Sequence, residues 1–306
     1  MAAVERLTTD FKVRFGFTSR GSSDLDLAAF PQLIDDLERL RFDSIWIPEI
    51  MLSGGFDPIV ALTHAAARTS RLKVGTHLVL PGRAPVRIAR ELANLDVLSG
   101  GRVLLTMVLG LPAEQEVLAQ GVIKSERGKM LDEMVPLLRR MWAGETVNHD
   151  GDLFTLREAQ VMPRPIQQPL EMWFGGQAPA AIRRAGRLAD GYLPGLVTPT
   201  QGAALREEVQ AAAADAGREI DPEHFGINLA YSRGPLSPEA IAQLRPRIGD
   251  ADPADFVPSG PSALQERIAE WVENGYSKFL LRPVDRPDDW TAELETLAAD
   301  VLHLQS

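Results

Sequence analysis

The feature that most constrains the fold is a regular alternation of short apolar runs with longer segments of helical periodicity. Eight apolar runs have the length of strands, and a segment of helical periodicity follows each of them. This alternation favours parallel strands joined by crossover helices, and continuous apolar runs are typical of strands buried on both faces. The expected strands are 11–17, 44–48, 72–80, 103–109, 172–174, 191–193, 226–231 and 278–282. The expected helices are 24–40, 58–69, 86–98, 126–142, 177–188, 200–216, 260–274 and 290–302.

Eight such units in a chain of 306 residues predict a single (β/α)8 TIM barrel with insertion segments, spanning residues 1–306. A doubly wound sheet with an appendage is the alternative. Residues 1–10 are expected to form an N-terminal tail. Residues 143–168, with a small hairpin, and residues 232–260, which are rich in proline, are expected to be excursions from the barrel.

In a barrel, functional side chains gather at the C-terminal ends of the strands. Glu49 and His77 lie at the ends of the second and third expected strands, and Gly110 follows the fourth. The fifth strand ends directly before Gly175, Gly176 and Gln177. These positions are therefore the first candidates for binding and chemistry.

The Gly-Gly turn after the fifth strand has the form strand, glycine turn, helix start. Glycine allows a ligand to approach the bare backbone, and the first N–H groups of a helix have no partner within the helix. The helix dipole also favours an anion at this end. Gly175 and Gly176 are therefore a candidate phosphate site, although a plain turn between a strand and a helix would have the same sequence.

Composition excludes several classes of function. The net charge of -10 disfavours a nucleic-acid partner, and the absence of cysteine excludes disulfides and thiolate metal sites. The five histidines lack the mutual spacing of metal ligands, so no metal is expected. No apolar run has membrane-spanning length and the first ten residues contain no apolar leader, so the expected location is the cytoplasm. The cluster Arg83, Arg87 and Arg90 is interpreted as the solvated outer face of a helix.

Several blocks of the sequence, in order and spacing, resemble the bacterial luciferase-like monooxygenase family. The agreement extends from about residue 11 to residue 194 and is weaker beyond it. The most specific blocks are Leu-Asp-x-Leu-Ser-Gly-Gly-Arg and Trp-Phe-Gly-Gly-Gln. The blocks that carry the resemblance are 75–76, 81–85, 92–102, 126–128, 132–133, 163–165, 173–177 and 189–194.

This resemblance implies a (β/α)8 barrel and an oxidoreductase that binds the deazaflavin coenzyme F420 or, alternatively, FMN. It places the cofactor phosphate on the amides of Gly175, Gly176 and Gln177. Gly110 and Leu111 correspond to the segment that lines the ring pocket. The family's non-proline cis peptide, under the ring, would fall at His77-Leu78.

Two positions depart from the deazaflavin-dependent members that the chain otherwise resembles. Glu49 is followed by Ile50, where many members have a histidine that donates a proton, and Leu111 stands where many have tryptophan. Glu49 and His77 are the remaining candidates for proton transfer. Arg127 and Lys124 are candidates for contact with the acidic tail of a deazaflavin, or are simply solvated.

Three functions follow from the resemblance. The first is an F420-dependent oxidoreductase that transfers a hydride to or from a small organic substrate. The second is an FMN-dependent monooxygenase, and the third is a non-catalytic protein that binds a flavin or deazaflavin. The resemblance also implies a homodimer, and it identifies no particular substrate.

Overall fold

The computed structural model describes residues 9–19, 28–52 and 55–306. The barrel strands are β1 Arg14–Thr18, β2 Ser44–Pro48, β3 Lys73–Val79, β4 Val103–Val108, β7 Met172–Phe174, β8 Gly191–Tyr192, β9 Gly226–Tyr231 and β10 Lys278–Pro283. They form one eight-stranded sheet in the order β8-β7-β4-β3-β2-β1-β10-β9. Bridges between Tyr192 and Phe225 and between Gly195 and Asn228 also link the β8 region to β9. The fold is a nearly closed (β/α)8 barrel, and the predicted fold class is confirmed.

The helices follow the predicted order, with three additions. The long helices are α1 Phe30–Leu40, α2 Pro58–Arg68, α3 Pro85–Ser99, α5 Arg127–Trp142, α6 Pro179–Leu188, α7 Pro199–Asp215, α10 Pro261–Glu273 and α11 Trp290–Val301. The additions are α4 Glu114–Gln120, α8 Pro238–Ile248 and α9 Pro253–Phe256. Residues 24–27 of the first expected helix, and residues 1–8 of the expected tail, lie outside the described residues.

The chain divides into two compact units. Unit 1 comprises Met1–Thr18, Asp35–Ile45 and Phe174–Ser306, and unit 2 comprises Ser19–Ile34 and Trp46–Trp173. The prediction that residues 1–306 are one domain therefore stays a prediction.

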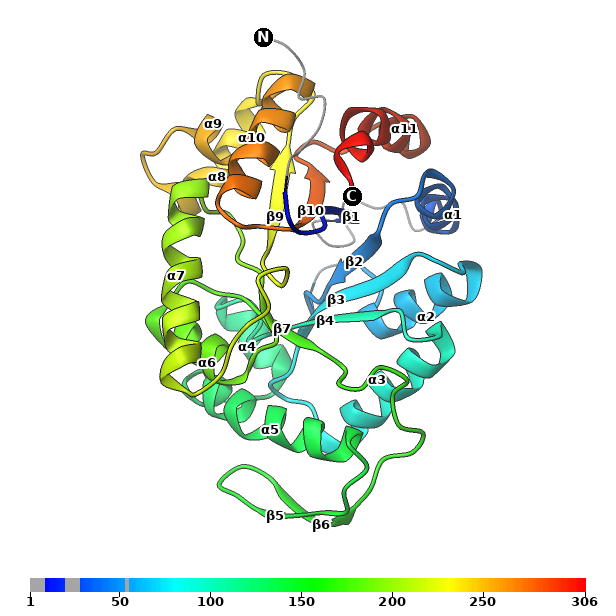
Figure 1. Cartoon of the computed structure of the whole chain (residues 1–306), viewed down its shortest axis with the longest axis vertical. Helices are drawn as coiled ribbons and strands as arrows, with labels where there is room; N and C mark the ends of the chain where they lie inside the picture. The colour runs from blue at the N-terminus through cyan, green and yellow to red at the C-terminus, as the bar shows by residue number, and fades with distance from the viewer. Residues whose placement is uncertain (1–8, 20–27, 53–54) are drawn as a thin grey trace. The chain divides into compact units, whose positions relative to one another are not determined.

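In unit 2, β3 and β4 pair in parallel over six residues, from Val74 opposite Val103 to Val79 opposite Val108. Helices α2 and α3 contact these strands and each other, as Figure 1 shows. Asp57 begins α2 by accepting hydrogen bonds from the backbone N–H groups of Ile59 and Val60, and Pro58 occupies the first turn. Val74, Leu78, Leu105 and Met107 are fully or almost fully buried, which makes the sheet the core of this unit.

The Leu-Asp-x-Leu-Ser-Gly-Gly-Arg block holds unit 2 together at the N-terminal end of β4. The fully buried carboxylate of Asp96 accepts hydrogen bonds from the backbone N–H groups of Ile166 and Gln167, at 2.6 and 3.0 Å, and from the Gln167 side chain at 2.7 Å. Arg102 donates to the carbonyl oxygens of Ala66, Thr69, Leu72 and Ser99. This Asp96–Arg102 lock joins three segments that are distant in the sequence, so the most specific block of the resemblance has a structural role here.

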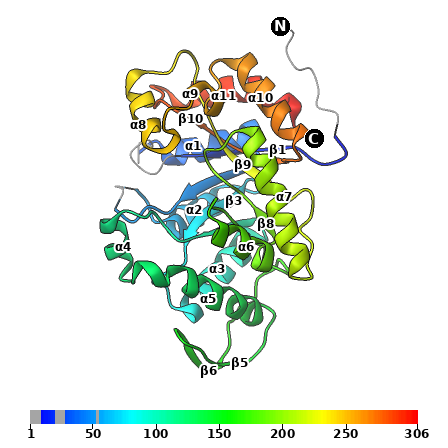
Figure 2. The same cartoon turned by 90° about the vertical axis from the view of Figure 1, so that its left-hand side faces the viewer.

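In unit 1, β10 lies between β1 and β9 and pairs in parallel with both. Helix α6 packs beside α7, and Figure 2 shows the pair. Gly202 of α7 leaves room for the ring of Trp271 in α10, because a Cβ at this position would collide with that ring. The Tyr276 hydroxyl donates to the carbonyl oxygen of Gly202 at 2.9 Å, so α7 is joined to α10 by packing and to the segment before β10 by a hydrogen bond.

Segment 143–168 contains the expected hairpin, formed by the antiparallel strands β5 Val147–Asp150 and β6 Thr155–Ala159. Glu133 of α5 anchors it by contacting His149 Nε2 at 2.8 Å and by accepting hydrogen bonds from the backbone N–H groups of Leu153 and Phe154. Segment 232–260, expected to be an irregular excursion, contains α8 and α9. Pro238 and Pro253 each stand in the first turn of one of these helices, a position that needs no N–H donor.

Candidate cofactor-binding site

His77 lies on β3 with its ring against the ring of Trp46. The two ring centroids are 5.3 Å apart and the planes are inclined by 31°. Gly75, two residues earlier on the same face, makes this possible, because a Cβ there would lie 2.5 Å from the Trp46 ring. Trp46 is almost fully buried whereas His77 is partly exposed. The imidazole is therefore oriented by an aromatic wall and retains an accessible side.

Thr106 is the direct neighbour of His77 on β4, and paired residues of adjacent strands point to the same face. The Thr106 side chain is 1% exposed. Its hydroxyl has no hydrogen-bond partner among the described residues. Two polar groups thus share one face of the sheet in unit 2.

The expectation of a cis peptide at His77-Leu78 is wrong. Within the described chain, the cis peptide bonds are Met162-Pro163 and Gln168-Pro169. His77 and Leu78 pair with Thr106 and Met107 in unbroken register, so both residues continue a regular strand.

Glu49 directly follows β2 and is engaged by both of its oxygens. Oε2 accepts the backbone N–H of Val79 at 2.8 Å, and Oε1 accepts Arg83 at 2.6 Å. Arg83 in turn donates through Nε to the carbonyl oxygen of Val79 at 2.9 Å, which closes the Glu49–Val79–Arg83 cycle. The backbone N–H of Glu49 also donates to the carbonyl oxygen of His77 at 3.0 Å.

Burial raises the pKa of the Glu49 carboxyl above its ordinary value, although Arg83 and the N–H of Val79 act in the opposite direction. The interpretation of Arg83 as part of a solvated helix face is wrong. It precedes α3, and its side chain is 21% exposed and paired with a carboxylate that is 9% exposed. Glu49 and Arg83 are far apart in the sequence, so the sequence alone did not indicate this ion pair. The fold brings the two side chains together at the end of β3.

The segment after β4 is fixed by a buried arginine. Arg127 is 6% exposed and donates to the carbonyl oxygens of Leu109 and Leu111, each at 3.0 Å. Gly110 between them has a φ of +81°, a conformation that favours glycine. Leu111 is 46% exposed. Lys124 is exposed and donates to the carbonyl oxygen of Pro112 at 2.9 Å. The hydrogen bonds of the Arg127 guanidinium thus hold the backbone of the segment that is predicted to line the cofactor ring.

In unit 1, Gly175, Gly176 and Gln177 connect β7 to α6. Gly176 has a φ of +100°, and the Cβ that Gly175 lacks would lie 2.6 Å from the carbonyl oxygen of Leu193. Helix α6 starts at Pro179 after Ala178, whose side chain provides no cap. In the part of the chain that the structure describes, the backbone N–H groups of residues 176–178 have no protein acceptor.

Tyr192 determines how this turn presents its amides. Its hydroxyl donates to the carbonyl oxygen of Gly176 at 2.6 Å. In a trans peptide the C=O and the following N–H point in opposite directions, so the N–H of Gln177 is directed away from Tyr192. The Gln177 side chain donates to the carbonyl oxygen of Gly195 at 2.9 Å. The side chains of Tyr192 and Gln177 thus hold the turn in place, and the N–H of Gln177 points away from Tyr192. This arrangement fits an anionic group such as a phosphate.

The predicted site residues therefore form two groups. In unit 2, Glu49 follows β2, His77 and Leu78 lie within β3, and Gly110 and Leu111 follow β4. Gly175, Gly176 and Gln177 lie in unit 1. Leu78 itself is fully buried, on the opposite face of β3 from His77. Sequence reasoning did not find the roles of Arg83 or Tyr192; Tyr192 nevertheless belongs to one of the blocks that carry the resemblance.

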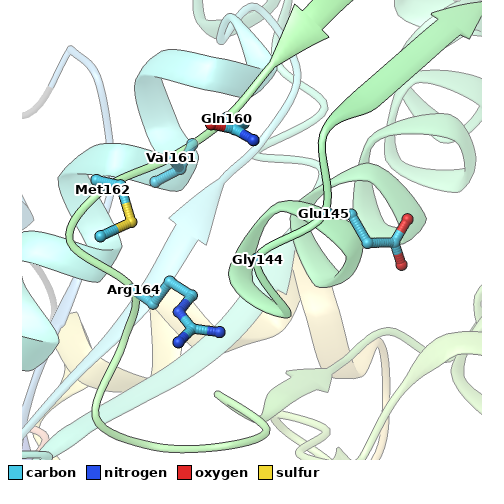
Figure 3. A pocket seen from close by; sticks show the side chains of 6 residues that line it. All are labelled: Gly144, Glu145, Gln160, Val161, Met162 and Arg164. Carbon is cyan, nitrogen blue, oxygen red and sulfur yellow. The ribbon is translucent and has the colours of Figure 1, made fainter.

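A pocket of about 250 Å³ in unit 2 lies away from these residues. It is bordered by Gly144 and Glu145 after α5 and by segment 160–164, and Figure 3 shows Met162 and Arg164 on that segment. Arg127, at the other end of α5, contacts the ring segment. A helix of 16 residues separates the two places by roughly 24 Å, so the pocket is not part of the candidate site.

Within residues 9–19, 28–52 and 55–306, no group of three or more His, Asp or Glu side chains has an arrangement that could hold a metal ion. None of the helices in those ranges combines the length and the apolar character that crossing a membrane requires.

The structure is thus a (β/α)8 barrel with a glycine turn after β7 and a partly exposed histidine in β3. Residues 11–303 match the luciferase-like monooxygenase family, and the chain belongs to this family.

The chain is 32% identical over 278 residues to a protein from Microbacterium testaceum named F420-dependent glucose-6-phosphate dehydrogenase, covering 78% of this chain and 82% of that protein. It is 28% identical to a protein of the same name from Intrasporangium calvum, covering 87% and 91%. A third relative of that name, from Amycolatopsis mediterranei, is 30% identical, and the match spans 63% of its length.

Solved structures share the fold at low identity. An F420-dependent secondary alcohol dehydrogenase in complex with an F420-acetone adduct has a TM-score of 0.81 at 19% identity, covering 97% of this chain and all (100%) of that one. The F420-dependent tetrahydromethanopterin reductase of Methanopyrus kandleri has a TM-score of 0.76 at 20% identity, covering 95% and 99%.

Proposed function

We propose that this protein is an oxidoreductase that uses coenzyme F420 for hydride transfer to or from a small organic substrate. The observation that carries the proposal is the turn at Gly175, Gly176 and Gln177, which presents unpaired amides at the predicted place of the cofactor phosphate. The names of the three relatives support F420 as the cofactor.

Each unit, taken by itself, offers residues that suit one part of a flavin-like cofactor. The amides of 176–178 would hold the phosphate, and Gly110, Leu111, His77 and Leu78 belong to the segments that would border the ring. The bound deazaflavin would supply the hydride chemistry, and the protein would bind, orient and shield it.

His77 is the first candidate for proton transfer to the substrate, and Glu49 is the second. His77 carries an imidazole, the side chain most often used to transfer protons, and is partly exposed, whereas both oxygens of Glu49 are already engaged. The raised pKa of Glu49 keeps it a candidate acid, and its cycle with Arg83 gives it an anchoring role as well.

Two other functions are supported by specific observations. The family name supports an FMN-dependent monooxygenase. The engaged carboxylate of Glu49, next to Ile50 in place of a histidine, supports a non-catalytic protein that binds a flavin or deazaflavin. We also propose a cytoplasmic location, from the sequence pattern, and a homodimer, as the family resemblance implies. The exposed apolar residues Leu118 and Ile123 would suit a subunit contact. Sedimentation velocity measures the oligomeric state.

The test is a titration of the purified protein with F420 and, separately, with FMN, followed by absorbance and fluorescence. We expect saturable F420 binding, with reduction or oxidation of the cofactor by one member of a panel of alcohols, aldehydes, ketones and sugar phosphates. Tight FMN binding without F420 binding would identify the monooxygenase. F420 binding without turnover across the panel would identify the non-catalytic protein.

A further inference from the structure

Gln120, the last residue of α4, carries a buried side-chain amide that has no hydrogen bond to any described residue. The side chain is 6% exposed. Neither Oε1 nor Nε2 reaches solvent, and neither has a hydrogen-bond partner among the described residues. Burying an amide without a hydrogen bond costs free energy, and an apolar side chain of similar shape would avoid this cost.

The position of this amide is next to the candidate ring site in unit 2. The Cβ that Gly110 lacks would collide with Gln120 Nε2, so the amide occupies the space that a side chain at 110 would take. The same absent Cβ would lie 3.2 Å from Val79 Cγ1. Val79 shares its face of β3 with His77, because side chains two residues apart in a strand point the same way. Gln120 therefore lies at the face of the sheet that carries His77.

The backbone of Gln120 is held close to the turn before Arg83, whereas its side-chain amide has no hydrogen bond to a described residue. A Cβ at Gly82 would collide with the carbonyl oxygen of Gln120, which shows how closely the end of α4 approaches the turn before Arg83. Glu116, one turn earlier in α4, accepts the backbone N–H groups of Met51 and Leu52 at 3.2 and 3.0 Å. With the helix held at these points, three side-chain torsions remain for the amide to turn toward a ligand.

We propose that Gln120 is a binding residue that recognises the imide edge of the cofactor ring. A glutamine amide offers one acceptor and two N–H donors, and a ring C=O beside a ring N–H is complementary to it. The inference rests on the proposed function, because it requires a flavin or deazaflavin beside Gly110. It assigns to the cofactor site a residue that lies ten positions after Gly110 in the sequence.

The test compares Gln120→Met with Gln115→Met. Methionine keeps the unbranched shape and removes the hydrogen-bonding groups, and Gln115 is an exposed residue of the same helix. Each variant and the wild type are titrated with F420 and with FMN, the absorption spectrum of the bound cofactor is recorded, and Tm is measured without cofactor.

We expect Gln120→Met to raise the Kd for the cofactor about 10-fold or more and to shift the absorption band of the bound cofactor. We expect its Tm without cofactor to be equal to or above that of the wild type, since a buried unpaired amide is removed. Gln115→Met should change none of these quantities.

Three results overturn the inference. Unchanged affinity and spectrum in Gln120→Met, with a wild type that binds cofactor, overturn it and leave the proposed function intact. A loss of affinity that is matched by a fall in Tm shows a structural role instead. A wild type that binds neither F420 nor FMN overturns the proposed function, and this inference with it.

Discussion

The guanidinium of Arg83 lies 2.6 Å from the carboxylate of Glu49, at the end of β3 and beside the backbone of Val79. Removing the cation leaves a carboxylate that is 9% exposed and whose remaining partner among the described residues is the N–H of Val79. We expect Arg83→Met to lower the free energy of unfolding by about 3 kcal/mol at pH 7.5. The deficit should be smaller at pH 5, where more of the carboxyl is protonated. Urea unfolding at both pH values measures it.

A double-mutant cycle separates this pair from general disruption of the turn. The variant Glu49→Gln/Arg83→Met has no uncompensated charge, so it should be more stable at pH 7.5 than Arg83→Met alone. Equal stability of the two would show that the ion pair is not what Arg83 contributes.

The pH dependence of stability gives a second test of Glu49. Its pKa in the folded protein is raised above the ordinary value of 4.5. Its favourable contribution is therefore fully present below about that pH and declines as the pH rises through the folded pKa. We expect the stability of the wild type relative to Glu49→Gln to fall between pH 4.5 and 7.5, as chemical unfolding at several pH values would show. A rise over this range would mean that the ion pair outweighs burial.

The anion site in unit 1 is tested with Gly176→Asp. An aspartate places a side chain and a negative charge at the amides that we assign to the phosphate, so F420 should bind at least about 10-fold more weakly. Gly176→Ala has the same strain at a φ of +100° without the charge and should bind more tightly than Gly176→Asp. Gly217→Asp, at a positive φ with open space around it, is the control for strain alone. Unchanged affinity in Gly176→Asp would show that the phosphate binds elsewhere.

Tyr192→Phe tests how the amides are oriented. Losing the hydrogen bond to the carbonyl oxygen of Gly176 releases the peptide that directs the N–H of Gln177 outward. One hydrogen bond of about 1 kcal/mol corresponds to an F420 affinity about 5-fold lower, measured by fluorescence titration. If the affinity is retained, the turn does not need this support.

Asp96→Ala addresses the Asp96–Arg102 lock in unit 2. It removes a carboxylate that accepts three N–H groups in a fully buried place. We expect the free energy of unfolding to fall by about 3 kcal/mol, whereas cofactor affinity at low temperature stays within a factor of two. Asp215→Ala, at an exposed position of α7, should leave both quantities unchanged.

The sequence predicted the barrel because its signal is local and repeated. Strands 44–48, 172–174 and 226–231 have their predicted bounds, since each is a short apolar run between clear breaks. Helix α4 was missed because seven residues carry too little periodicity, and α8 was missed because proline suggested irregular structure.

The candidate site likewise contains features that the sequence could predict and features that it could not. The glycine turn at 175–176 could be found from the sequence, because strand, glycines and helix start are contiguous. The pairing of Glu49 with Arg83 and the bond from Tyr192 to Gly176 could not, because only the fold brings these residues together. His77-Leu78 shows the opposite error, where a family feature was transferred to a strand whose own register with β4 has no irregularity.

The Asp96–Arg102 lock lies at the start of β4 and the candidate ring segment follows its end. A strand of six residues separates them by roughly 20 Å, and none of the lock's described hydrogen bonds involves Glu49, His77 or Gly110. Protein engineering of this scaffold can therefore treat robustness and reactivity as separate variables. Residues around 50–52, 77–82 and 109–120 can be randomised to seek new substrates, while the lock and the Glu49–Arg83 ion pair are kept to preserve expression and folding across the library.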